Sequence, residues 1–525
     1  MNKKGTGYFF QDFYFFGKKV ACPLFCSAIL LILSFPNFEI SLLAWFALVP
    51  LFFVIKTSSP VRAFIFSYLT GAIFFAGTLY WLTYVTKLGY PVLILYLSLF
   101  FGLFGLLSSI FFRKFENSRL SFLLCVIIPS LWVFVEFLRG WLFTGFPWGL
   151  LGYSQYKNPL LIQIADITGA YGVSFIIVMV NFVLFSCLSG FLKKENKRAF
   201  VLQATIFCII LGLYIGYGAF SLKKSETDTN LRLAVAQGSI EQFKKWDPAY
   251  RDYVLDRYET LTKEAAEGGV DLVVWPETAM PGFIDECDIQ IRLLKVMKEA
   301  NAPLFSGAVT YKSEKGKDCF FNSAILFSPD GTIRRQYDKI HLVPFGEYIP
   351  FESEIPFFRS VIDKEIGNYT KGEEFTIFEI TKENERPYKY AALICFEDIF
   401  PELTRRFAME GADFLINITN DAWFRESSEQ FQHAQASVFR AVENRTSVIR
   451  AANNGFSCYI SPKGIIEDSI YNKNTGNIYK EGSKTFNIKV EKNRSFYTSY
   501  GDIFVCACFA FLILCYFIDF CLPRI

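Results

Sequence analysis

The chain has 525 residues, of which 52% are hydrophobic and only 20% are charged. A soluble protein of this length would carry more charge on its surface, so the composition argues against an ordinary soluble enzyme. The formal net charge is only +3, and no lysine-rich tract is present, which argues against a nucleic-acid-binding protein.

Apolar stretches recur along the chain, and most approach the roughly 20 residues that a helix needs to cross a bilayer. They lie at 20–36, 40–55, 63–86, 88–112, 120–143, 168–192, 199–222 and 503–518. The stretch at 120–143 contains two charged residues, Glu136 and Arg139. The first stretch follows Lys18 and Lys19, as in a signal peptide, but no A-x-A-like cleavage site follows, so we expect it to be retained. We therefore predict a multi-pass α-helical membrane protein with about eight spans.

Basic residues in the short connections predict the orientation of these spans. With a cytoplasmic N-terminus, the inner segments hold 14 lysines and arginines and the short outer segments hold 3. We expect a membrane domain of seven helices at 1–224 and an extracytoplasmic domain at 225–498. A final helix and a short cytoplasmic tail occupy 499–525. Both termini are then cytoplasmic.

The polar segment alternates between strand and helix patterns, which predicts an α/β domain of sheets layered with helices. Strands are expected at 231–237, 271–275, 303–310, 320–328, 332–338, 375–381, 388–395, 412–418, 447–452 and 456–461. Helices are expected at 248–267, 288–300, 399–409 and 428–444. Asp330-Gly331 is a strong turn signal between two of the strands and predicts a hairpin.

The cysteines do not form a disulfide framework, because nine of the 13 lie in or beside apolar stretches. The polar segment contains the other four, Cys287, Cys319, Cys395 and Cys458. A pair among Cys287, Cys319 and Cys458 would be free to form a bridge in an oxidising compartment, and the sequence leaves this open.

Two strand ends in the polar segment carry charged residues suited to catalysis. In 273–282, an apolar strand ends at Pro276 and delivers Glu277. In 337–348, a strand leads into a loop with Lys339 and Glu347. Active sites of α/β domains are commonly built at strand ends. Taken alone, such a glutamate or lysine is more often a solvated loop residue.

The segment 391–402 places Cys395 at the end of an apolar strand, with a helix opening near Ile399. A nucleophile on such a strand-to-helix elbow is exposed, and nearby backbone N–H groups can receive an oxyanion. A cysteine in this position is more often an inert core thiol. The order of the three segments and their context favour a catalytic site.

These segments resemble the nitrilase superfamily, whose site is a Glu, a Lys and a Cys in that order on an α-β-β-α sandwich. They are most similar to its membrane-bound branch, the apolipoprotein N-acyltransferases, and the likeness covers the whole chain. The matching segments are EFLRGWLFTGFPWG at 136–149, AVAQGSIEQFKKW at 234–246, HLVPFGEYIP at 341–350 and INITNDAWF at 416–424. Two positions depart from the family pattern: Phe396 replaces a common Tyr, and Arg425 replaces a common Gly.

The expected mechanism is acyl transfer through a cysteine thioester. Glu277 accepts the proton of the Cys395 thiol, and Lys339 stabilises the thiolate and the oxyanion, with the Phe396 N–H as a second donor. Supporting carboxylates, Glu347 and Glu397, are expected to orient Lys339 and balance its charge. A Cys-His hydrolase is disfavoured because the chain has only two histidines, His341 and His433.

Four residues are candidates for contact with substrate: Trp246, Trp423, Glu136 and Arg139. The resemblance implies a phospholipid as sn-1 acyl donor and the α-amino group of a diacylglyceryl-cysteine lipoprotein as acceptor. It also implies the bacterial inner membrane, a periplasmic catalytic domain, and no cofactor or metal. We expect a monomer and no nucleic-acid partner. The alternatives are a membrane-tethered amidase and a catalytically dead lipid-binding or transport protein.

Overall fold

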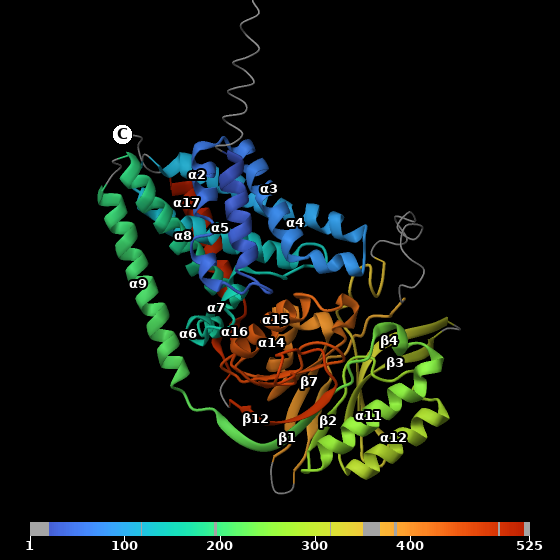
Figure 1. Cartoon of the computed structure of the whole chain (residues 1–525). Helices are drawn as coiled ribbons and strands as arrows, with labels where there is room; N and C mark the ends of the chain where they lie inside the picture. Colours follow the sequence, from blue (N-terminus) through green and yellow to red (C-terminus); the bar gives the residue numbers. More distant parts are fainter. Residues whose placement is uncertain are drawn as a thin grey trace, which may run out of the picture. The chain divides into compact units, whose positions relative to one another are not determined.

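The computed structural model describes residues 20–116, 118–193, 197–314, 317–349, 368–382, 386–491 and 494–518. It divides into two compact units (Figure 1). Unit 1 comprises Met1–Ser221 together with Asp502–Ile525, and unit 2 comprises Leu222–Gly501. Unit 2 is therefore inserted, in sequence, before the last helix of unit 1.

Unit 1 is helical throughout its described residues. Its elements are a helix at Val20–Leu33, then η1 (Ser41–Trp45), α2 (Val49–Thr57), α3 (Pro60–Thr78), η2 (Tyr80–Tyr84), α4 (Gly89–Phe115), η3 (Ser121–Leu123), α5 (Leu124–Trp141), η4 (Leu151–Gln155), α6 (Pro159–Ile162), α7 (Ala165–Thr168), α8 (Ala170–Lys193), α9 (Lys197–Leu222) and α17 (Ile503–Phe517). Within the described residues, five helical segments are long and apolar enough to cross a membrane: Pro60–Thr78, Gly89–Phe115, Ser121–Trp141, Ala170–Gly190 and Arg198–Leu222.

Three other predicted spans coincide with shorter apolar helices, at Val20–Leu33, Ser41–Thr57 and Ile503–Phe517. The helices are therefore compatible with a membrane protein, as the composition predicts, and the number of spans stays a prediction.

Close helix packing in unit 1 depends on glycine at the α3–α4 contact. A Cβ atom on Gly105 would lie 2.4 Å from the carbonyl oxygen of Ala63, which is too close for any larger residue. Small residues let helix backbones approach in this way in membrane proteins. The last helix, α17, packs against α5, where the rings of Phe134 and Phe509 stack at 4.9 Å. The final helix thus completes the bundle that the first helices begin.

Unit 2 contains two six-stranded sheets. The first has the order β12-β1-β2-β3-β4-β5, formed by β1 (Thr227–Gln237), β2 (Leu272–Val274), β3 (Leu304–Glu314), β4 (Lys317–Phe327), β5 (Ile333–Asp338) and β12 (Gly482–Val490). The second has the order β11-β10-β9-β8-β7-β6, formed by β6 (Ile377–Ile380), β7 (Tyr388–Ile394), β8 (Phe414–Thr419), β9 (Ser447–Ala452), β10 (Cys458–Ile460) and β11 (Ile466–Ser469). The central strands β1–β3 and β7–β9 run parallel, and the flanking strands pair antiparallel.

The two sheets face each other, with contacts between β1 and β9 and between β4 and β7. The helices α11 (Arg251–Ala266) and α12 (Cys287–Ala300) lie on one side of the strands, and α14 (Pro401–Met409) and α15 (Glu429–Asn444) lie on the other (Figure 1). Unit 2 is thus an α-β-β-α sandwich. Five short helices in the described residues occupy its connections and its end: α10 (Gln242–Lys245), η5 (Pro248–Tyr250), η6 (Cys395–Ile399), η7 (Asp421–Phe424) and α16 (Phe496–Tyr500).

Two strands were not expected from the sequence, β11 and β12. The strand β12 pairs antiparallel with β1 across about 250 residues of sequence and extends the first sheet. In its second half the buried residues Phe486, Ile488 and Val490 alternate with polar residues, whereas the first four residues show no alternation. The predicted hairpin at Asp330-Gly331 is present between β4 and β5, with Gly331 at φ +86°.

Candidate active site

Glu277 and Lys339 are brought together at the ends of two strands of the first sheet. Glu277 follows β2 and Lys339 follows β5, and both side chains are buried. The Lys339 Nζ lies 3.7 Å from Glu277 Oε1 and 2.8 Å from Glu347 Oε1. Burial alone would lower the pKa of Lys339, but the charges of Glu347 and Glu277 outweigh it and raise that pKa. Lys339 is therefore an ammonium ion at neutral pH.

Asn322, in β4, links the two carboxylates of this cluster. Its Nδ2 donates to Glu277 Oε1 at 2.8 Å and to Glu347 Oε1 at 3.0 Å. Its backbone carbonyl also accepts the Lys339 N–H at 2.8 Å. Asn322 was not among the residues predicted from the sequence, because an asparagine in the middle of a strand has no local signal. Asn322 fixes the spacing of the carboxylates on either side of the lysine.

Cys395 begins η6, directly after β7, with φ +53°. A side chain at positive φ is strained, and such strain is typical of a nucleophile on a strand-to-helix elbow. Burial and the charge of Glu277 raise the pKa of the Cys395 thiol well above its usual range, while Lys339 opposes the rise. The resting thiol therefore keeps its proton at neutral pH, and its activation requires a base.

The carbonyl group of Cys395 is held by two donors from the second sheet and its helix. Asn417 Nδ2 lies 3.0 Å from this oxygen and His433 Nε2 lies 3.2 Å from it. Asn417 lies in β8 and His433 in α15. The hydrogen bonds stabilise the strained backbone at the elbow, and neither residue was a candidate from sequence for this role.

A buried charge cluster lies next to this elbow. His433 Nε2 is 2.8 Å from Asp398 Oδ1, and Arg450 Nη1 is 2.8 Å from Asp398 Oδ2. Burial would lower the pKa of His433, but mainly the charge of Asp398 raises it to about 10. His433 is therefore a cation at neutral pH. A buried carboxylate paired with two cations satisfies the requirement for compensation of buried charge.

The carboxylate of Glu397 is held mainly by backbone N–H groups. Its Oε1 accepts the Tyr337 hydroxyl and the N–H groups of Ile340 and His341, and its Oε2 accepts the N–H of Ile394. No ion pair joins Glu397 to Lys339 in the described part of the chain, but the charge of Lys339 opposes the rise in the pKa of Glu397, so the expected charge balance stays a prediction. Glu397 holds the backbone that follows Lys339, and burial raises its pKa to about 7.

The aromatic candidates remain accessible on the surface of unit 2. Trp246, after α10, is 47% exposed, and Trp423, in η7, is 51% exposed. The contact of these two residues with substrate stays a prediction. The ring of Phe396 lies 5.2 Å from that of Phe400 and packs edge-on against it. Cys287, Cys319 and Cys458 are all free thiols.

Glu136 and Arg139 lie in unit 1, on α5. Arg139 Nη1 donates to the carbonyl groups of Phe146, at 3.1 Å, and Trp148, at 2.6 Å. Glu136 Oε1 accepts the N–H of Leu151 at 2.8 Å. The two side chains therefore hold the loop between α5 and η4, and their contact with substrate stays a prediction.

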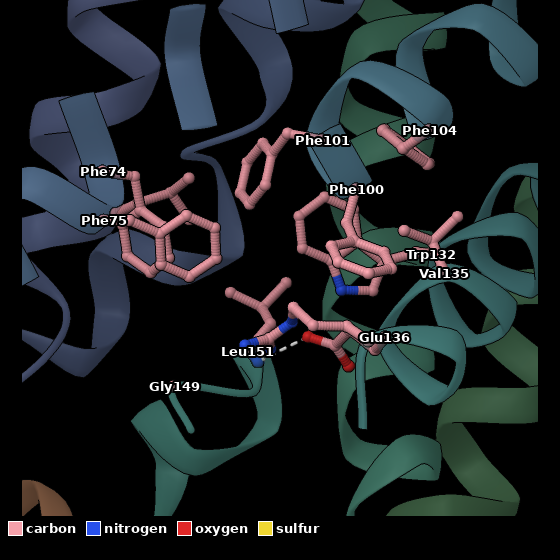
Figure 2. Close-up of a pocket in the computed structure, with 12 residues that line it drawn as sticks. Phe74, Phe75, Phe100, Phe101, Phe104, Trp132, Val135, Glu136, Gly149 and Leu151 are labelled. Atoms are coloured by element: carbon pink, nitrogen blue, oxygen red, sulfur yellow. Dashed lines mark hydrogen bonds between the residues drawn. The ribbon is translucent and has the colours of Figure 1, made fainter. Parts of the chain in front are cut away.

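The same two residues line a small cavity of about 20 Å³ in unit 1, enough for about one water molecule. Figure 2 shows its aromatic wall and the hydrogen bond from Leu151 to Glu136. The other lining residues are mostly aromatic or aliphatic: Leu31, Phe74, Phe75, Phe100, Phe101, Phe104, Trp132, Val135, Gly149 and Leu151.

Known proteins similar to this chain match both units. Residues 27–183 match the model of the apolipoprotein N-acyltransferase N-terminal domain, and residues 232–478 match that of carbon-nitrogen hydrolase. The apolipoprotein N-acyltransferase of Geobacter metallireducens is 38% identical over 493 residues, 92% of each chain. That of Pasteurella multocida is 32% identical over 84% of this chain and 85% of its own. Among solved structures, the nitrilase-superfamily member Nit3 of Saccharomyces cerevisiae is 19% identical, with a TM-score of 0.37, over 50% of this chain and 90% of its own.

Proposed function

Since this chain belongs to the apolipoprotein N-acyltransferase family, we propose that it moves a fatty acyl group from a phospholipid to a lipoprotein. The acceptor is the α-amino group of the N-terminal diacylglyceryl-cysteine, and the reaction is the last step of lipoprotein maturation. One observation carries this proposal. A cysteine at a strained elbow experiences the charges of Glu277 and Lys339, in a chain whose other unit consists of apolar helices.

In the first half-reaction, Cys395 takes the acyl group. Glu277 accepts the thiol proton while Sγ attacks the ester carbonyl of the donor. The Lys339 ammonium stabilises the oxyanion of the tetrahedral intermediate, with the Phe396 N–H as a second donor. The ester C–O bond then breaks, and the proton held by Glu277 passes to the leaving alcohol. The products are a lysophospholipid and the Cys395 thioester.

In the second half-reaction, the acceptor amine attacks the thioester carbonyl. Glu277 accepts a proton from the attacking nitrogen, and Lys339 again stabilises the oxyanion. The C–S bond breaks, the sulfur regains a proton from Glu277, and the product is an amide. Glu347 and Asn322 keep the lysine and the base in place through both steps.

The substrates reach the site from the membrane in this proposal. We place unit 2 on the periplasmic side of the bacterial inner membrane, with both termini cytoplasmic and about eight spans. The excess of basic residues in the inner connections supports this orientation. Trp246 and Trp423 are exposed aromatic residues suited to contact acyl chains. We expect the enzyme to act as a monomer.

The test is the intact mass of the protein after incubation with a synthetic phospholipid that carries a mass-labelled sn-1 chain. We expect one added acyl chain in the wild type and none in Cys395→Ala. A diacylated lipopeptide should then consume the adduct quickly, since the membrane tether supplies the local concentration that favours the amine over water. Rapid release of free fatty acid without lipopeptide would indicate a hydrolase instead.

A further inference from the structure

A buried lysine outside the catalytic set contacts the backbone of the proposed base. Lys245, the last residue of α10, is only 1% exposed, and its Nζ donates to the carbonyl oxygen of Glu277 at 2.7 Å. Lys245 makes no ion pair with any residue that the structure describes. A buried ammonium without a carboxylate partner is costly, so a purely structural role is poorly explained.

The backbone around Glu277 needs external support because the strand has already ended. β2 stops at Val274, and Thr278 has φ +46°. On either side of Glu277, backbone hydrogen bonds tie the chain to Gly307 of β3: Gly307 N–H to the Pro276 carbonyl at 3.2 Å, and Ala279 N–H to the Gly307 carbonyl at 3.0 Å. The Glu277 carbonyl itself is bound by Lys245.

The segment that carries Lys245 is anchored at its other end to the second sheet. Gln242 Oε1 accepts from Asn420 Nδ2 at 2.7 Å, and Asn420 directly follows β8. Asn453 Nδ2 donates to Asn420 Oδ1 and to the Ile240 carbonyl, each at 2.9 Å. Short polar contacts therefore fix residues 240–245 between the two sheets, immediately before the exposed Trp246.

We infer that Lys245 is a positioning residue for the catalytic base: its ammonium fixes the backbone of Glu277 and supplies positive charge to the Glu277 and Cys395 site. This inference rests on the proposed function, because it assumes that Glu277 is the base. Lys245 also links the base to Trp246, so the candidate substrate contact and the proton acceptor keep a fixed spacing.

The charge of Lys245 depends on pH in the physiological range. Burial lowers its pKa to about 7, while the charges of Glu277 and Cys395 oppose the decrease. The cation is therefore present below about pH 7 and is lost above it. The charges of Glu277, Lys339 and Asp421 also act on the Cys395 thiol. Any help that Lys245 gives to thiol ionisation is greatest below pH 7.

The experiment compares the full-length wild type with Lys245→Met and a matched control, Lys463→Met, in detergent. Lys463 also donates to a backbone carbonyl, that of Leu222 at 3.0 Å, but is not part of the site. We expect Lys245→Met to slow acyl-adduct formation by about 10- to 100-fold, the usual effect of removing an orienting partner. Lys463→Met should retain the wild-type rate.

A second measurement does not need the lipid substrate. Alkylation of Cys395 by iodoacetamide is followed by peptide mass spectrometry at pH 6 and pH 8.5. We expect the wild-type to Lys245→Met rate ratio to be larger at pH 6, where Lys245 is charged. An equal ratio at both pH values would show that the charge of Lys245 does not act on Cys395 and would overturn the inference. A wild-type rate of adduct formation in Lys245→Met would also overturn it.

The two measurements, adduct formation and alkylation, distinguish failure of this inference from failure of the proposed function. If the wild type forms no acyl adduct, the proposed function fails, while the alkylation ratio still decides whether Lys245 acts on Cys395. If Lys245→Met does not fold, Lys245→Gln, which keeps a donor but removes the charge, takes its place, with the same expected pH dependence of alkylation.

Discussion

The carboxylate of Glu347 lies 2.8 Å from the ammonium of Lys339, closer than the 3.7 Å that separates this ammonium from Glu277. Glu347 is therefore the main counter-ion of the lysine. Glu277 forms the longer of the two ion pairs with Lys339, so its carboxylate is held less closely, which suits the proposed role of base.

Glu347→Gln should impair catalysis more than folding. The amide preserves the shape of the side chain but removes the charge that raises the pKa of Lys339, and Lys339 is then drawn to Glu277. We expect acyl-adduct formation to slow by about 10²- to 10³-fold, as when an oxyanion donor is lost. Intact mass against time measures the rate. The control is Glu379→Gln, which removes an exposed partner of Lys389. A rate within twofold of wild type for Glu347→Gln would contradict the assignment of Glu347 as the main counter-ion of Lys339.

Arg425→Gly should stabilise unit 2. Arg425 has φ +53° and ψ −159°, a backbone conformation that only glycine adopts without strain. The relief should be about 1 kcal/mol, reduced by the greater chain entropy of glycine in the unfolded state. Thermal unfolding in detergent should show a higher midpoint. Arg425→Ala is the control, since it removes the same side chain but keeps the Cβ atom, and an equal gain in both variants would exclude relief of backbone strain.

His433→Asn should destabilise unit 2 in a pH-dependent way. Its pKa is raised to about 10, mainly by Asp398, from a reference value of 6.5. The resulting stabilisation is complete below about pH 6.5 and is lost as the pH rises toward 10. Breaking such a buried pair costs about 3–5 kcal/mol. Chemical unfolding of wild type and variant at pH 6 and pH 9.5 should show the larger difference at pH 6; a larger difference at pH 9.5 would contradict this role.

Cys287 can report the side of the membrane on which unit 2 lies. It is an exposed free thiol at the start of α12. A thiol reagent that does not enter the cytoplasm should label Cys287 in intact cells, as read by peptide mass spectrometry. The variant Cys287→Ser provides the background, and the buried Cys458 should stay unlabelled. Labelling of Cys287 only after lysis would reverse the proposed orientation.

The sequence predicted features with strong local signals better than those formed by distant contacts. Glu277 and Cys395 each end an apolar strand within a recognisable motif, so their positions were visible in the sequence. Asn322 has no such motif, and Lys245 was not singled out within the matching segment 234–246, because the importance of both lies in contacts with residues 45 and 32 positions away. The strand β12 was missed although Phe486, Ile488 and Val490 alternate with polar residues, and its pairing with the distant β1 has no local signal.

The contact between α17 and α5 has a consequence for biosynthesis. Residues 222–501 are synthesised before α17, so the surface of α5 around Phe134 has no Phe509 beside it until the whole of unit 2 has left the ribosome. The bundle of unit 1 is therefore completed last. A chain that stops within unit 2 therefore leaves the surface of α5 around Phe134 without its α17 neighbour.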